Sequence, residues 1–245
     1  MDYRNYQLTK NEYGKIIFIS LGISVLIAFL FYRSIGGICC FPVIIWLLCK
    51  RERKIRREKR SQQLLEEFVN GVRVLNTALQ AGISMENAWR EVQKELQIMY
   101  GENSLFFREV KEINHSVALN VPIEKLMLQF AYRSGLEDII TFAELFAYGK
   151  RSGGNWRRII GDVVLHIQDK YDARKEIEVM VASKKLEQQV LNVIPMGILL
   201  FLQFSSWDYM SVLYHNPMGI LCMSICLLGY GGAVLLSEKI LQIQV

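Results

Sequence analysis

The chain has 245 residues, of which 51% are hydrophobic and 22% are charged. It is therefore apolar for a soluble protein, yet too charged to consist of membrane spans alone. The net charge of +5 arises outside the middle of the chain, because residues 58–188 hold 18 basic and 19 acidic side chains. This balance argues against a nucleic-acid-binding surface, which needs a local excess of Lys and Arg.

Four apolar runs lie near the two ends of the chain. They are Ile16–Tyr32, Ile38–Cys49, Val190–Phe204 and Met218–Leu236. A spanning helix needs roughly 20 apolar residues, so the first and last runs are long enough. The two short runs each contain a proline, and we expect each to form a helical hairpin with its longer neighbour. The alternative for either short run is a buried helix of a soluble domain.

The first run is expected to remain as an uncleaved anchor. The stretch before it contains Asp2 and Glu12, and no small-x-small cleavage pattern follows it. All five cysteines lie in the apolar runs, where small packing residues explain them better than a disulfide framework or a zinc site.

A basic segment, Lys50–Arg60, follows the second apolar run and holds eight basic and two acidic residues. Basic residues beside a span favour the cytoplasmic side, and anionic lipid headgroups attract them. The segment Ser205–Pro217, between the last two runs, has no Lys or Arg. The sequence therefore predicts that both termini and the middle zone are cytoplasmic.

The middle zone shows apolar residues at steps of three and four from Glu58 onwards, which is typical of amphipathic helices. Gly82 is expected to end the first helix in a left-handed conformation, and Ser84 is expected to cap the second through its side chain. Ser104 can cap a third helix, and Pro122 fits the first turn of a fourth.

A fifth helix is predicted from Glu137, and a sixth begins near Trp156 and continues toward the third apolar run. No alternating strand pattern interrupts this zone, so we expect an all-α protein with an antiparallel bundle of about six helices between two transmembrane hairpins. The predicted domains are residues 1–50, 51–188 and 189–245.

The motifs that carry chemistry are missing from the sequence. It contains no phosphate-binding loop of the G-x-x-x-x-G-K-[ST] type, no G-x-S-x-G and no H-E-x-x-H. Carboxylates such as Glu66, Glu67, Glu91 and Glu95 are expected on a solvated face, with an acidic cluster that binds a divalent cation as the alternative. We therefore expect no enzyme activity, no catalytic residues, no cofactor and no resident metal.

Several segments resemble one family. They are "LNTALQAGISMENAW", "EVKEINHSVALNVPIEKLMLQFAYRSG", "FAELFAYGKRSGGNW" and "VLNVIPMGIL", in this order. Together they resemble the type II secretion system F domain, over the chain from about Arg51 to its C-terminus. Because the chain has one such domain where secretion and pilus proteins usually have two, the resemblance favours the tight-adherence (TadB/TadC-like) branch.

The resemblance implies a platform protein of the cytoplasmic membrane in a pilus or type II-like secretion machine. Its implied partners are a separate cytoplasmic ATPase, a related platform chain and pilin subunits, all beside the lipid bilayer. The alternative is a membrane receptor or adaptor whose helical bundle recruits a signalling partner, and a transporter subunit comes third. A neighbouring gene for a secretion-type ATPase or a prepilin would separate these functions.

One candidate docking surface is the turn between the fifth and sixth helices. It carries Lys150, Arg151, Arg157 and Arg158 around Gly153 and Gly154. An ordinary solvated helix junction is one interpretation of this basic cluster. The other is that the cluster docks an acidic patch of the partner ATPase, because exposed charges tune association and specificity.

Overall fold

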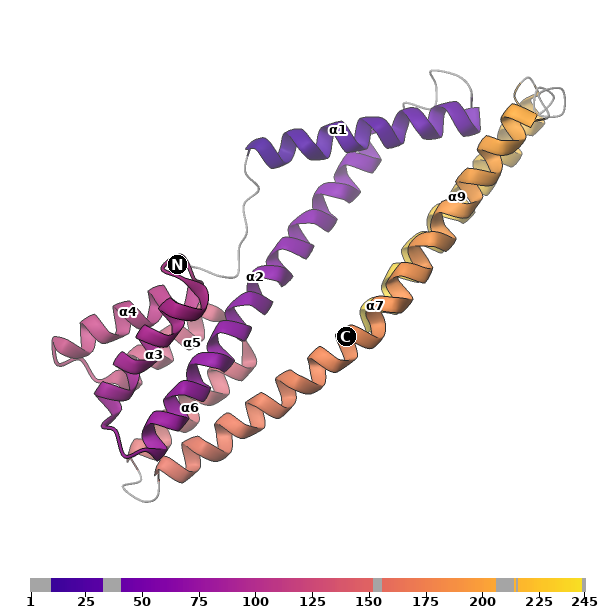
Figure 1. Ribbon diagram of the computed structural model, residues 1–245. Helices are drawn as coiled ribbons and strands as arrows, with labels where there is room; N and C mark the ends of the chain where they lie inside the picture. The colour runs from indigo at the N-terminus through magenta and orange to yellow at the C-terminus, as the bar shows by residue number, and fades with distance from the viewer. Residues whose placement is uncertain (1–9, 33–40, 152–155, 206–213, 215, 244–245) are drawn as a thin grey trace. The chain divides into compact units, whose positions relative to one another are not determined.

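The computed structural model describes residues 10–32, 41–151, 156–205, 214 and 216–243, and within these ranges every regular element is helical, with no strand (Figure 1). The elements are α1 (Lys10–Ile27), the π-helical turn η1 (Ala28–Tyr32), α2 (Phe41–Gln80), α3 (Met85–Tyr100), α4 (Leu105–Ala118), α5 (Ile123–Ser134), α6 (Glu137–Arg151), α7 (Trp156–Ser205) and α9 (Pro217–Ile243). The predicted all-α class is thereby confirmed.

The chain divides into two compact units. The first includes Arg53–Ala173, and the second comprises the described residues of Leu8–Glu52 and Arg174–Val245. The helices α2 and α7 each contribute residues to both units. The first unit is shorter than the predicted middle domain, because the C-terminal part of that domain is the exposed middle of α7.

The core of the first unit is built around aromatic rings from α2, α4, α5 and α6. The ring of Phe68 lies 5.3 Å from that of Phe106 and 5.3 Å from that of Phe142, both edge-on. Phe106 in turn lies 5.5 Å from Phe130. Such pairs contribute roughly 0.5–1.5 kcal/mol each beyond the burial of their apolar area. The aromatic contacts therefore hold α2 against the successive helices α4, α5 and α6.

The Phe106 side chain of α4 packs closely against the backbone of α2 at Gly71. A Cβ atom built on Gly71 would lie 2.6 Å from Cε1 of Phe106 and 3.4 Å from Cγ1 of Val92. Glycine at this position is therefore required by packing, because any side chain would displace the Phe106 ring from its aromatic neighbours.

The turns between the helices follow the expected chemistry with one exception. Gly82 adopts φ of +85°, the left-handed region that favours glycine, and the Ser104 hydroxyl accepts a hydrogen bond from the Phe107 N–H at 3.1 Å. Ser84 does occupy the N-cap position of α3, but its side chain makes no capping hydrogen bond. That part of the prediction was wrong, because extended backbone at the N-cap does not by itself aim the hydroxyl at a free N–H.

The second unit joins η1 to the C-terminal part of α7 and to α9. Leu30, Phe31 and Met223 form its buried apolar cluster. The Gln203 amide donates to the backbone oxygen of Phe29 at 3.3 Å, and the Tyr214 hydroxyl donates to that of Leu30 at 2.6 Å. The π-helical turn alters the usual ladder of backbone hydrogen bonds, and these two side chains bind carbonyl oxygens within it.

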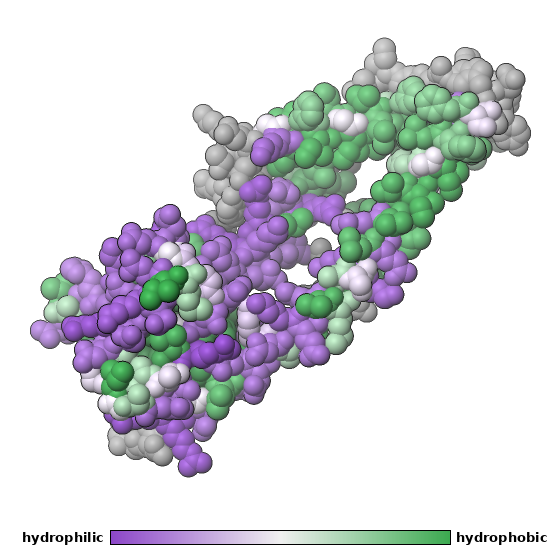
Figure 2. Space-filling view, in the orientation of Figure 1, coloured by the Kyte–Doolittle hydropathy of each residue, from purple (hydrophilic) through white to green (hydrophobic). Residues whose placement is uncertain are grey.

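Three helical segments are long and apolar enough to cross a membrane in the part of the chain that is described. They lie within Tyr13–Phe31, Arg157–Ser205 and Pro217–Ser237. Large apolar side chains cover their outer surfaces, and Phe204 is 81% exposed. Figure 2 shows hydrophobic residues over α1, α9 and the neighbouring part of α7, and mainly hydrophilic residues over the helices of the first unit. The chain therefore has the surface of a membrane protein.

The predicted second span does not appear among these three segments. Its residues 38–40 lie outside the described ranges, and Phe41–Cys49 forms the first nine residues of α2. The third apolar run is the end of α7, which continues through Pro195 without interruption, as the expectation of one long helix requires.

Candidate functional sites

The first candidate site is the basic junction between α6 and α7. Arg157 and Arg158 lie in the first turn of α7, and both are exposed. Lys150 and Arg151 belong to the last turn of α6, but their side chains lie outside what the structure describes, as do Gly153 and Gly154 altogether. The structure therefore places two of the four predicted docking residues on a common exposed helix start.

Electrostatics make this junction unusual. The N-terminal end of a helix carries a partial positive charge, and basic side chains there are unfavourable by roughly 0.3–1 kcal/mol each. The first turn of α7 contains Arg157 and Arg158 and no acidic residue. The charge at the start of α7 therefore does not itself favour these two basic side chains.

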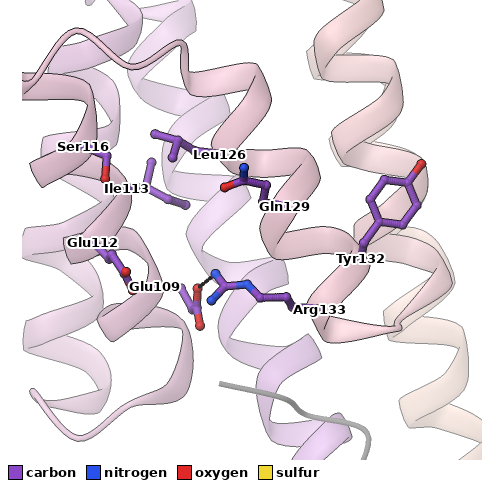
Figure 3. Close-up of a pocket in the computed structure, with 8 residues that line it drawn as sticks. All are labelled: Glu109, Glu112, Ile113, Ser116, Leu126, Gln129, Tyr132 and Arg133. Carbon is purple, nitrogen blue, oxygen red and sulfur yellow. Dashed lines mark hydrogen bonds and ion pairs between the residues drawn. The ribbon is translucent and has the colours of Figure 1, made fainter.

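A second candidate is the groove between α4 and α5 (Figure 3), a hollow of about 520 Å³. Its lining residues are Glu109, Glu112, Ile113, Ser116, Leu126, Gln129, Tyr132 and Arg133. The Arg133 guanidinium and the Glu109 carboxylate point toward each other and form an ion pair at 2.5 Å, while Tyr132 points away from them. This pair neutralises the most buried charge of the groove.

Tyr132 instead joins α5 to α6. Its hydroxyl donates to Oε1 of Glu144 at 3.2 Å. This hydrogen bond, together with the negative charge of Glu144, raises the pKa of Tyr132 above its usual value of 10.0. The hydroxyl therefore keeps its proton to a higher pH than an unperturbed tyrosine does.

One buried carboxylate, Glu67, was not predicted from the sequence; it is only 1% exposed. Its Oε2 accepts hydrogen bonds from the Ser104 hydroxyl and the Phe106 N–H, both at 2.8 Å, and its Oε1 accepts one from the Gln63 amide at 2.8 Å. The prediction of a solvated face was wrong at this residue, because the carboxylate caps the positive end of α4.

The apolar spacing contained a signal for this burial. Glu67 lies three residues after Leu64 and four before Gly71, both of which contact the core. A carboxylate in phase with a core stripe indicates a paired buried group, because an unpaired one is too costly to bury. The carboxylate thus has a structural function that joins α2 to α4.

Other polar contacts fix the remaining helix pairs of the first unit. The Lys170 amine pairs with Asp138 at 2.5 Å between α7 and α6, and the Asn114 amide donates to the Trp89 backbone oxygen at 3.1 Å between α4 and α3. Among the described residues, no three or more His, Cys, Asp or Glu side chains gather as metal ligands would.

Comparisons with protein-family models, with curated proteins and with solved structures find no match to this chain, so the resemblance to the F domain family remains an expectation.

Proposed function

We propose that this chain is a platform protein of the cytoplasmic membrane in a tight-adherence-type pilus or type II-like secretion machine. In this proposal a separate cytoplasmic ATPase acts on the first unit, and the membrane helices pass the movement to pilin subunits. A related platform chain, or a second copy of this one, completes the assembly.

The observation that carries the proposal is the sharing of α7 between the two units. Ile160, Val164 and Ile167 of this helix lie in the core of the first unit, whereas Leu199 and Leu200 pack against the apolar cluster of the second. A continuous helix with side chains in both cores gives a displacement of the first unit a direct path to the second. Pro195, which lies between the two sets of core residues, is the point where this helix bends most easily. A coupling protein needs such a connection, and an energy source supplied by its partner.

The junction of α6 and α7 is the proposed docking surface for the ATPase. Arg157 and Arg158 are exposed at the start of the same helix that enters the second unit. An acidic patch on the ATPase would offset the unfavourable charge–dipole interaction at this position. Docking there would apply the partner's movement directly to α7.

We further propose that both termini and the first unit are cytoplasmic, with two hairpins in the membrane. The basic segment Lys50–Arg60 and the absence of Lys and Arg between α7 and α9 support this orientation. In a chain without its native cysteines, a cysteine at Asn216 should react with a membrane-impermeant thiol reagent in intact cells, and one at Gln93 should not. Reaction at Gln93 would overturn the orientation.

The function is tested by capture of the ATPase on the intact chain in detergent. The wild-type chain should retain the secretion-type ATPase of the same organism, and Arg157→Glu with Arg158→Glu should weaken this retention and abolish pilus output. Arg90→Glu with Lys125→Glu is the matched control, because both side chains are exposed elsewhere on the first unit and the change of charge is the same.

The outcomes separate the two parts of the proposal. If both double variants capture the ATPase as the wild type does, with the same helical circular dichroism, docking at the junction is wrong. If the wild-type chain captures no ATPase and its deletion leaves pilus assembly intact, the platform function is wrong.

A further inference from the structure

The basic segment of α2 begins directly after an apolar stretch of the same helix. The apolar stretch Phe41–Cys49 ends one residue before Lys50, and α2 continues without interruption to Gln80. Trp46 is 62% exposed, and the Lys50 amine lies over its ring at 5.2 Å from the centroid. Tryptophan beside a cationic residue is typical of the boundary between hydrocarbon and headgroups.

The charges of this segment are arranged by sign around the helix. At 3.6 residues per turn, one arc of about 160° holds six basic residues and no acidic one. These are Lys50, Arg53, Lys54, Arg56, Arg57 and Arg60. The opposite side holds both glutamates of the segment, the apolar Ile55 and the remaining two basic residues, Arg51 and Lys59. The helix therefore has one strongly basic face.

The centre of the basic face is open to its surroundings. Lys50, Arg53, Lys54 and Arg57 are all exposed. Lys54 also lies 3.8 Å from Glu58, with both side chains more than half exposed, and an exposed pair of this kind contributes little. The exposure of these four side chains leaves the face accessible to an anion outside the helix.

We propose that this basic face of α2 binds the headgroups of anionic lipids. Lys50 and Arg57 are seven residues apart, or about 10 Å along the helix axis. The headgroup layer on one side of a bilayer is roughly 5–8 Å thick. Lipid phosphates attract a cation outside this layer over a further Debye length of about 8 Å, so the basic residues lie within the range of this attraction. The whole face thus lies within reach of the lipid phosphates when Trp46 is at the boundary.

Chemistry favours phosphate as the ligand. The planar guanidinium groups of Arg53 and Arg57 can bind phosphate oxygens in a bidentate way. Because the face starts immediately after apolar residues of the same helix, the membrane is the first anionic surface that it meets. This binding requires that the apolar start of α2, Phe41–Cys49, lies in a bilayer, and it does not depend on the proposed platform function.

The test compares lipid selectivity of the intact chain in reconstituted bilayers. The chain is placed in phosphatidylcholine vesicles that contain a trace of spin-labelled phosphatidylglycerol or spin-labelled phosphatidylcholine. The fraction of each label that is immobilised beside the protein gives a selectivity ratio. We expect the wild-type chain to select phosphatidylglycerol several-fold at low salt and less at high salt, since exposed charges are screened.

Two variants with the same change of charge locate the binding face. Arg53→Gln with Arg57→Gln should bring the selectivity ratio close to one, whereas Arg51→Gln with Lys59→Gln should keep most of it. Equal ratios in the wild type and the Arg53/Arg57 variant would overturn the proposal and leave an acidic protein surface as the partner. An equal loss in both variants would overturn it as well, because net charge would then explain the selectivity.

Discussion

Replacing Glu67 should destabilise the first unit more than any other single change of an acidic residue in α2. In Glu67→Ala the Ser104 hydroxyl and the Phe106 N–H lose the Oε2 acceptor that each reaches at 2.8 Å. Both residues are buried, so water does not readily replace the carboxylate. The start of α4 thereby loses its anionic cap.

The magnitude follows from these two hydrogen bonds. A hydrogen bond to a charged group contributes about 1.5–3 kcal/mol, so Glu67→Ala should cost about 3–6 kcal/mol of unfolding free energy. Glu67→Gln keeps one oxygen that can accept from both donors, and Gln63 can rotate its amide to meet the new NH₂ group. Charge-assisted bonds are roughly twice as strong as neutral ones, so the amide should cost about half as much.

The measurement is a urea titration of the intact chain in detergent micelles, followed by far-ultraviolet circular dichroism and by hydrogen exchange. The midpoint should fall in the order wild type, Glu67→Gln, Glu67→Ala, and the amides at the start of α4 should lose protection first. Glu66→Ala is the matched control, because this neighbouring side chain is only partly buried and should lose about 1 kcal/mol or less.

Equal midpoints for Glu66→Ala and Glu67→Ala would refute this reasoning. An unchanged rate of amide hydrogen exchange at residues 105–107 in Glu67→Ala would also refute it, since the carboxylate would then not cap α4.

Two further predictions concern glycines. Gly71→Ala should cost about 1–3 kcal/mol of unfolding free energy through overpacking, because its Cβ would lie 2.6 Å from the Phe106 ring. The double variant Gly71→Ala with Phe106→Leu should cost less than the sum of the two single variants, and strict additivity in the urea midpoints would contradict the contact. Gly82→Val should cost about 1–3 kcal/mol through backbone strain, since φ is +85° while the space around it is open. Gly82→Asn should cost less, because asparagine tolerates the left-handed region; equal losses for valine and asparagine would show that strain is not the cause.

Local patterns predicted most helix boundaries of the first unit. The spacing of apolar residues and the turn residues Gly82 and Ser104 placed the ends of α2, α3 and α4 within a few residues. These features depend on the chain's own neighbours, so a single sequence contains them. The run of α7 toward the third apolar run was also expected, since no glycine or proline lies between Gly161 and Pro195. Its continuation through Pro195 came from the structure.

Features that depend on another helix were not predicted. The position of Glu67 depends on a hydroxyl and an N–H group that lie 37 and 39 residues away in the chain. The requirement for Gly71 depends on the position of Phe106. The groove between α4 and α5 likewise arises only when both helices are placed. For the basic junction, the sequence predicted both the charges and the helix start near Trp156. The structure adds that Arg157 and Arg158 are exposed there.

The basic face of α2 has a further physical consequence for the depth of this helix in a membrane. At helical spacing, Trp46, Arg53, Arg57 and the buried Leu64 lie on nearly the same side of α2. Moving the helix inward by one turn, about 5.4 Å, would bring Lys50 and Arg53 toward the hydrocarbon. Each charged residue at the centre of a bilayer costs about 2.5–3.5 kcal/mol on insertion scales. The substitutions Arg53→Leu and Arg57→Leu would remove this cost of burying charge. They would also connect the apolar residues at the start of α2 with the core residues that begin at Leu64. With Phe41–Cys49 in a bilayer, as we propose, the charges would separate two apolar surfaces on one continuous helix and set where its membrane segment ends.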